Sequence, residues 1–503
     1  MFRTQNVLLF LLLCGVNASF VYSQQAEVGF DDLEALIGAA NLEDGTGVTA
    51  AQVEAPPLNN LDGYLANPNS FQFNNTVFVD ATGTNSGQSS HASEVGFRMY
   101  GTLSMASGLG RAANPITGYE SVDFILNSTG IASGRDPEPF DFNLANHSYI
   151  LYQSETTLTT AQIVEILQRF DFMANQSETT HCVGLNNGST NPLPELWASS
   201  YNAISVGRTN GNHSAGITSI YGDGRTKPEI VAPESATSFA TPMVAASAAI
   251  LHEAGSGSTA TRSETIRALL LSGATKDEFS NWERTTTRPL DEVFGAGELN
   301  IYNSYMSLQG GEFDSSTNDP ATPVDLNGWD YQEEIVAGND LFYEFEVAEG
   351  TQLDQLSIVL CWNMDIIDSR RSAFSFRPQE NLGDLNLDFY DSTGSFMGSL
   401  IDESKSTVDN VEHIYLLDLP AGTYHLKVSS DTTKDFGLAW RSSSSDLILG
   451  DVNQDGFVDF SDIPLFVNIL MAGTYQYEGD LDHDGFVDFN DIPLFVDLLL
   501  GVM

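Results

Sequence analysis

A serine at the start of a helical stretch is the first residue whose position could do chemistry. The segment Thr237–Pro242 (TSFATP) leads into a run rich in alanine and valine, which predicts a helix. The hydroxyl of Ser238 would then be exposed at the positive end of the helix dipole, as a nucleophile requires. A serine at a helix start is more often an N-cap than a catalytic group, so its interpretation depends on partners elsewhere in the chain.

A second chemical pattern is a repeated acidic loop near the C-terminus. Asp451–Leu465 (DVNQDGFVDFSDIPL) recurs 29 residues later as Asp480–Leu494 (DLDHDGFVDFNDIPL). Oxygen-bearing residues at alternating positions, with a glycine at the sixth for a sharp turn, fit the first part of an EF-hand calcium loop. Two acidic surface turns are the alternative, but the same pattern with its glycine occurs twice. We therefore predict two calcium ions, held by Asp451, Asn453, Asp455, the Phe457 carbonyl, Asp459 and Asp462 and by Asp480, Asp482, Asp484, the Phe486 carbonyl, Asp488 and Asp491.

The elements that must position these residues change in character along the chain. Residues from about 30 to 310 mix strand patterns with helical stretches such as Ala161–Phe172, which predicts an α/β layer architecture. From Gly328 to Arg441, short alternating segments separated by turn residues predict an antiparallel β-sandwich. After each acidic loop, apolar residues recur at helical spacing from Ile463 and from Ile492, which predicts two short helices.

Charge and the N-terminal segment limit the class of protein. The 503 residues contain 20 Lys and Arg against 68 Asp and Glu, a formal net charge of −48 that argues against nucleic acid as a partner. Residues 1–23 combine a positive charge, a short apolar run and a cleavage pattern after Ser23, so we expect a signal peptide and a secreted, extracellular or cell-surface protein. No second apolar stretch is long enough to span a membrane. Cys182 and Cys361 lie in apolar runs and are expected to be buried free thiols.

Three segments together resemble the catalytic segments of the subtilisin-like serine proteases, or subtilases. They are Arg225–Leu251 around Ser238, the segment beginning His91-Ala92-Ser93-Glu94, and a strand that ends at Glu54, in the family's order of acid, histidine and serine. The resemblance covers about residues 30–310 and implies a three-layer α/β domain with a parallel sheet. It also implies a serine endopeptidase in which Ser238 is the nucleophile, His91 the general base and Glu54 the carboxylate that orients the histidine.

A further segment resembles the family's oxyanion-hole loop. Val183–Gly188 (VGLNNG) would supply the asparagine that stabilises the oxyanion, and either Asn186 or Asn187 fits. Three positions depart from the family's pattern: Glu54 stands where the family has aspartate, Ala236 replaces a glycine, and Glu94 replaces a second histidine. The alternative function is therefore a catalytically impaired subtilase fold that serves as an adhesion or scaffold component of an extracellular complex.

The C-terminal part resembles two further kinds of module. Residues 448–503 resemble a type I dockerin, because each loop has aspartate at its twelfth position and no entering helix, and this implies docking onto a cohesin-type partner. Residues 324–441 resemble the pre-peptidase C-terminal β-sandwich domains that follow secreted bacterial proteases. The expected organisation is a signal peptide (1–23), a peptidase domain (24–312), a linker (313–323), a β-sandwich (324–441), a serine-rich linker (442–447) and a dockerin-like domain (448–503).

Overall fold

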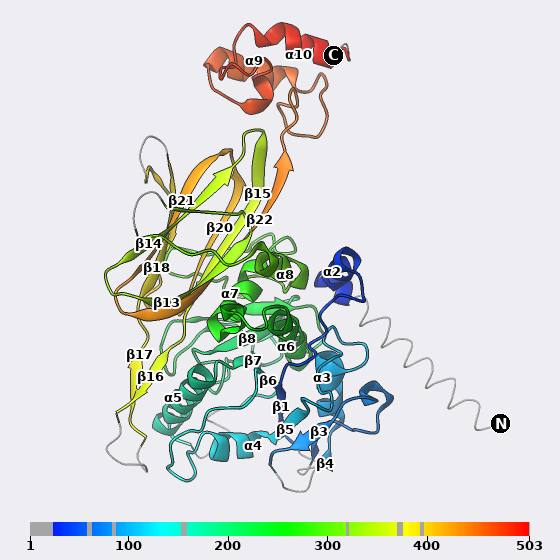
Figure 1. The fold of residues 1–503 in the computed structure, drawn as a ribbon, viewed down its shortest axis with the longest axis vertical. Coiled ribbons are helices and arrows are strands. Elements are labelled where there is room, and N and C mark those ends of the chain that lie inside the picture. Colours follow the sequence, from blue (N-terminus) through cyan, green and yellow to red (C-terminus); the bar gives the residue numbers. More distant parts are fainter. Residues whose placement is uncertain are drawn as a thin grey trace, which may run out of the picture.

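The computed structural model describes residues 24–57, 63–82, 87–151, 158–317, 321–369, 376–392 and 397–501. The predicted signal peptide lies outside these ranges. Figure 1 shows an α/β domain at one end of the molecule, a β-sandwich in the middle and a small helical tail at the other end. Within the described residues, no helix is both long enough and apolar enough to cross a membrane.

A seven-stranded sheet forms the centre of the α/β domain. Its order is β11-β8-β7-β6-β1-β5-β3, and every neighbouring pair is parallel, which confirms the predicted α/β architecture. From β1 the chain first adds β3 and β5 on one side of the sheet and then β6, β7, β8 and β11 on the other side. The carboxyl ends of β1 and β6 therefore flank a topological switch point, the place where α/β sheets bind ligands. The strands are β1 (Ala50–Glu54), β3 (Phe78–Asp80), β5 (Ile116–Glu120), β6 (Leu144–His147), β7 (Thr180–Gly184), β8 (Ala203–Arg208) and β11 (Ile230–Ala232).

Helices cover both faces of this sheet. Two successive residues of β7 point to opposite faces of the sheet, and each face has its own hydrophobic cluster: Cys182 packs in one cluster and Val183 in the other. The Cys182 face is covered by α3 (Ser90–Tyr100) and the alanine-rich α6 (Thr237–Ala254), with α7 (Ser263–Gly273), α8 (Ile301–Gly310) and α2 (Phe30–Ile37) beyond them. The Val183 face is covered by α5 (Thr160–Ser177), and Phe124 and Ile125, which directly follow the short α4 (Ser121–Asp123), pack in the same cluster. The shorter elements are β2 (Gly63–Leu65), η1 (Phe71–Phe73), β4 (Gly87–Gln88), η2 (Phe124–Ser128), β9 (Gly216–Ile217), β10 (Thr226–Lys227) and η4 (Thr259–Thr261).

Two sheets form the β-sandwich. One has the order β12 (Thr322–Val324), β14 (Asp340–Val347), β21 (Gly422–Ser430), β18 (Leu385–Asp391) and β19 (Leu400–Ser404), and the other β13 (Gly328–Ile335), β22 (Lys434–Asp446), β15 (Thr351–Cys361) and β20 (Val411–Leu419). Their pairs are antiparallel except for β12 with β14. The serines at 442–445, where we expected a linker, instead extend β22 and pair with β15.

The sandwich and the α/β domain share one core. Alternate residues of β15 point in opposite directions: Ile358 and Leu360 pack between the two sheets, whereas Val359 and Cys361 join the cluster that contains α6, α7 and α8. A hairpin of β16 (Asp365–Asp368) and β17 (Pro378–Asn381) extends from the sandwich alongside α5 (Figure 1). Cys182 and Cys361 are buried and free, as predicted.

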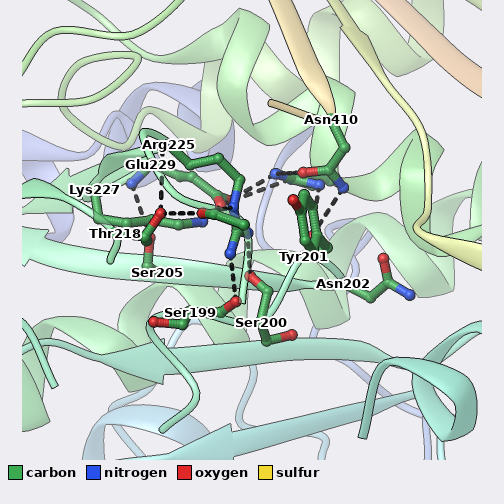
Figure 2. Close-up of polar contacts among 12 residues, drawn as sticks. Ser199, Ser200, Tyr201, Asn202, Ser205, Thr218, Arg225, Lys227, Glu229 and Asn410 are labelled. Carbon is green, nitrogen blue, oxygen red and sulfur yellow. Dashed lines mark hydrogen bonds and ion pairs between the residues drawn. The ribbon is translucent and has the colours of Figure 1, made fainter. Parts of the chain in front are cut away.

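Buried polar contacts reinforce this boundary (Figure 2). The amide of Asn410, in the sandwich, donates hydrogen bonds to the Tyr201 carbonyl at 2.9 Å and the Trp362 carbonyl at 2.6 Å. Its oxygen accepts a hydrogen bond of 3.3 Å from Arg267 of α7, whose guanidinium also bonds Glu229 at 3.1 Å. The sandwich therefore completes the hydrogen bonding of charged groups in the α/β domain.

The tail contains the two predicted helices, α9 (Ile463–Ala472) and α10 (Asp491–Leu499), with η5 (Tyr477–Gly479) between them. Phe466 of α9 stacks on Phe495 of α10 with 4.0 Å between ring centroids. These two residues occupy the same position in the two repeats, so each repeat supplies half of the tail's core.

Candidate active site

The predicted catalytic residues all lie at the carboxyl edge of the central sheet. Glu54 is the last residue of β1, and His91 lies in the first turn of α3. Asn187 follows the end of β7, and Ser238 is the second residue of α6. The parallel sheet thus brings together residues that are far apart in the sequence, at the edge where such sheets bind their ligands.

Glu54 and His91 form a direct pair. The Nδ1 atom of His91 lies 2.9 Å from Oε2 of Glu54, whose side chain is 1% exposed against 39% for the histidine. Burial lowers the pKa of His91, but the hydrogen bond and the charge of Glu54 outweigh this effect, so the pKa is raised above its usual value. A carboxylate at Nδ1 favours the tautomer with its proton there, which leaves Nε2 to accept a proton from a partner.

The start of α6 is held beside the histidine. The ring of Phe239, next to Ser238, stacks on the His91 ring with 6.0 Å between centroids and 28° between planes. The Arg98 guanidinium of α3 also lies over the Phe239 ring, 4.1 Å from the centroid of that ring. The hydroxyl of Ser148 donates a hydrogen bond of 2.9 Å to the Ser238 carbonyl. These contacts fix the first turn of α6, with the half-buried Ser238, against the helix that carries His91.

The two candidate asparagines have different surroundings. The Thr237 N–H donates a hydrogen bond of 3.0 Å to Oδ1 of Asn187, which leaves the amide nitrogen pointing away from that bond. Asn186 is instead tied to Ser214, through its main-chain N–H at 3.1 Å and its carbonyl at 2.8 Å. The side chain of Asn187 is therefore bonded to the residue that directly precedes Ser238.

Two of the three departures from the family pattern have no consequence for the site geometry. Ala236 has φ −145° and ψ 152°, an extended conformation that alanine adopts without strain. Glu94 is exposed and forms a helical ion pair of 3.1 Å with Arg98. The third departure, Glu54, is accompanied by two residues that sequence reasoning missed, Gln52 and Tyr100. Gln52 could have been found from the sequence, because it is a polar residue among the apolar residues of the strand, two places before Glu54.

The second acidic loop brings three carboxylates together. One oxygen from each of Asp480, Asp482 and Asp491 lies within 4.8 Å of the other two, and within the described ranges this is the one such group of His, Cys, Asp and Glu side chains. The first loop is closed in the same way, with Asp451 accepting from the amides of Asp455 and Gly456 as Asp480 does from those of Asp484 and Gly485.

The two loops differ in charge at one position. The first loop has Asn453 where the second has Asp482. Each turns at its glycine with φ 88°, a conformation that side chains disfavour. The remaining predicted ligands lie in the same two loops, and Asp462 and Asp491 accept the amide hydrogens of Asp459 and Asp488 at 2.9 and 2.8 Å. This set of oxygen donors suits a hard cation such as calcium.

One protein family matches part of the chain. Residues 152–297 match the model of the Subtilase family. The matched segment contains Asn187 and Ser238, whereas Glu54 and His91 precede it. The match supports a subtilase-type serine peptidase domain in general terms. No curated protein is similar enough in sequence to match.

Several solved protease structures are similar to parts of the chain. A serine protease of Aeromonas sobria is 13% identical, covers 79% of this chain and 89% of its own, and has a TM-score of 0.33. Proteases from Pseudoalteromonas arctica are 14% identical over 53% of this chain and 91% of theirs (TM-score 0.32). The MycP3 protease from the type VII (ESX-3) secretion system is 13% identical over 56% of this chain and 87% of its own (TM-score 0.35).

Proposed function

We propose that the protein is a serine endopeptidase that hydrolyses peptide bonds through an acyl-enzyme. The observation that carries this proposal is the 2.9 Å pair of Glu54 and His91, placed beside the helix that begins with Thr237 and Ser238. The match of residues 152–297 to the Subtilase family supports the same reaction class.

In this mechanism Ser238 Oγ attacks the peptide carbonyl while His91 Nε2 accepts its proton. The imidazolium then formed is stabilised by the buried Glu54 carboxylate, and it later protonates the leaving amine. The Asn187 amide and a main-chain N–H at the start of α6 would donate to the oxyanion, each contributing about 2.7–4 kcal/mol in the transition state. Water attacks the acyl-enzyme by the reverse route, with His91 as base, and regenerates the serine.

We further propose that the protein is secreted and that residues 448–503 bind two calcium ions and dock onto a cohesin-type protein. The three converging carboxylates of the second loop, the matching main-chain closure of the first and the repeat itself support calcium binding. Binding of the cations would neutralise carboxylates that repel each other in the empty loops. Calcium would thus be needed for the tail to hold its docking conformation.

The test of the proposed reaction is casein hydrolysis by the full chain and by Ser238→Ala. The variant should lose turnover while its thermal melt stays nearly unchanged. Ser235→Ala, an exposed serine three residues upstream, is the matched control and should keep its activity. Undiminished hydrolysis by Ser238→Ala would contradict the assignment. Absence of hydrolysis by the well-folded wild-type chain would favour the scaffold alternative.

A further inference from the structure

Two buried polar residues form a hydrogen-bonded chain that ends on the catalytic acid. We propose that Gln52 and Tyr100 are positioning residues that fix the carboxylate of Glu54, and with it the imidazole of His91, in the geometry for proton transfer. This inference rests on the proposed peptidase function and assigns the means by which a glutamate serves where the family has aspartate.

The contacts join the two elements that carry the catalytic pair. The amide nitrogen of Gln52, on β1, donates to Oε1 of Glu54 at 3.0 Å and to the Ala92 carbonyl of α3 at 2.9 Å. The hydroxyl of Tyr100, at the end of α3, donates to the amide oxygen of Gln52. Ala92 is the residue after His91, so one amide group holds both the acid and the first turn of the histidine's helix.

This network has only one good arrangement. Gln52, Glu54 and Tyr100 are 4%, 1% and 1% exposed, so their polar atoms must find partners within the protein. If the Gln52 amide were flipped, its oxygen would face the Glu54 carboxylate and the Ala92 carbonyl, both of which are acceptors. Tyr100, donating from the opposite side, reinforces the observed orientation. The chain of bonds therefore sets the orientation of Gln52, and Gln52 sets that of Glu54.

Glutamate needs such a support more than aspartate does. Its carboxylate is separated from the backbone by one more rotatable bond, and a displacement of about 1 Å in a catalytic group can lower a rate by about a hundredfold. Here each oxygen has its own partner, with Oε1 held by Gln52 and Oε2 facing His91. Residues 52 and 54 lie on the same side of β1, since side chains alternate along a strand, so the strand itself aligns support and acid.

A glycine inside α3 supports the same interpretation. Glycine is unfavourable in a helix interior, yet Gly96 lies in the middle of this helix. A Cβ atom at this position would lie 2.3 Å from the Tyr100 hydroxyl oxygen. Gly96 therefore leaves the space through which the phenol reaches Gln52.

The test compares Gln52→Met and Tyr100→Phe in the full chain, with Tyr343→Phe as the control. Gln52→Met keeps the length of the side chain but removes both donated bonds, and Tyr100→Phe removes one oxygen atom. Tyr343 also has a buried hydroxyl, which donates to Asp330 at 2.7 Å in the sandwich, far from the triad. Each variant is measured for kcat and KM on a peptide substrate and for the pKa of His91 by NMR titration.

We expect Gln52→Met to lower kcat by about 10- to 100-fold with KM changed less than about threefold, because the lost geometry matters mainly in the transition state. Tyr100→Phe should do the same to a smaller extent. The pKa of His91 should fall in both, because the Glu54 carboxylate no longer stays at Nδ1. Tyr343→Phe should match the wild type in all three quantities.

The inference would be overturned if Tyr100→Phe and folded Gln52→Met both kept the wild-type kcat and the wild-type pKa of His91. The NMR readout keeps this test separate from that of the function. If the wild-type chain hydrolyses nothing, the proposed function fails, whereas a lowered His91 pKa in these variants still supports the positioning role and an unchanged one still refutes it.

Discussion

At the residue scale, the unusual member of the site is Glu54. Its longer side chain is matched by the positions of its two partners, because His91 and Gln52 contact different oxygens of the same carboxylate. An aspartate at this position would hold its carboxylate one methylene closer to the backbone, short of the places where the Glu54 oxygens meet these two partners. The glutamate is thus built into the surrounding structure.

Replacement of this carboxylate gives the first prediction. Glu54→Gln should lower kcat by about 10³–10⁴-fold with little change in KM, because the lost effect is stabilisation of the imidazolium in the transition state. Glu54→Asp should also be impaired, since the shorter side chain loses the contacts to Gln52 and His91. Steady-state kinetics on a peptide substrate measure both, with Glu34→Gln, at an exposed glutamate of α2, as control. A kcat raised by Glu54→Asp would contradict this account.

The sequence predicted the candidate catalytic residues but not the residues that support them. Ser238, His91 and Glu54 lie in segments with a recognisable order, and the structure places all three at one edge of the sheet. Gln52 and Tyr100 have no motif, because their role arises only when β1 and α3 pack against each other. The contact between Asn187 and Thr237 likewise arises only in the tertiary structure.

At the element scale, a buried histidine of α6 makes the α/β domain sensitive to acid. His252 is fully buried, with Nε2 3.1 Å from the Thr180 hydroxyl of β7, and burial lowers its pKa to about 4. In the unfolded chain a histidine titrates near pH 6.5. Between these two pH values His252 stays neutral in the folded protein but binds a proton in the unfolded chain. The free energy of unfolding therefore falls as the pH falls from about 6.5 to about 4.

The second prediction follows from this titration. Wild-type protein should lose stability relative to His252→Gln by about 1.4 kcal/mol per pH unit below pH 6.5, up to roughly 3 kcal/mol. Denaturant unfolding of the two proteins at pH 7 and at pH 5 gives the difference between their free energies of unfolding at each pH. A difference that is the same at both pH values would contradict the buried neutral state of His252.

The acidic loops give the third prediction. Calorimetric titration of the full chain with calcium should show two sites, and Asp480→Asn should reduce the number to one, because it removes one of three converging carboxylates. Asp497→Asn, an exposed aspartate of α10 outside the loop, should keep both sites. Absence of calcium uptake by the wild-type chain, or two sites remaining in Asp480→Asn, would refute the assignment.

Elements were predicted best where the local pattern and the tertiary environment agree. Apolar residues at helical spacing after each loop predicted α9 and α10, and the alternation of strands and helices predicted the parallel sheet. For the serines at 442–445, the prediction of a linker was wrong. Serine has little preference for strands, so its pattern indicated a linker, but pairing with Gln352–Leu356 of β15 supplies the hydrogen bonds that make these residues part of β22.

At the scale of the whole molecule, the β-sandwich is joined to the α/β domain through a shared core and buried hydrogen bonds. Asn410 donates to main-chain carbonyls on both sides of this boundary, and its oxygen accepts from the buried Arg267. The pairing of Arg267 with Glu229 places the network directly before β11, the strand that leads into α6. Loss of the sandwich would therefore expose the layer that supports α6, the helix that carries Ser238.

The fourth prediction tests this dependence. Asn410→Ala should lower the free energy of unfolding by roughly 2–4 kcal/mol, because it leaves two buried carbonyls and part of the Arg267 guanidinium without partners. Thermal or denaturant unfolding measures the loss. Asn339→Ala, in an exposed turn of the sandwich, should cost less than about 0.5 kcal/mol. Equal stability of the two variants would mean that the polar boundary contributes little.

The central claim is that Ser238 is a nucleophile activated by His91 and Glu54, and covalent labelling with a fluorophosphonate probe tests it most directly. The account predicts stoichiometric labelling of the wild-type chain, with mass spectrometry locating the adduct on Ser238. Labelling should be strongly slowed in His91→Ala and retained in Ser235→Ala. A folded wild-type chain that remains unlabelled, or an adduct on any other serine, would contradict the account.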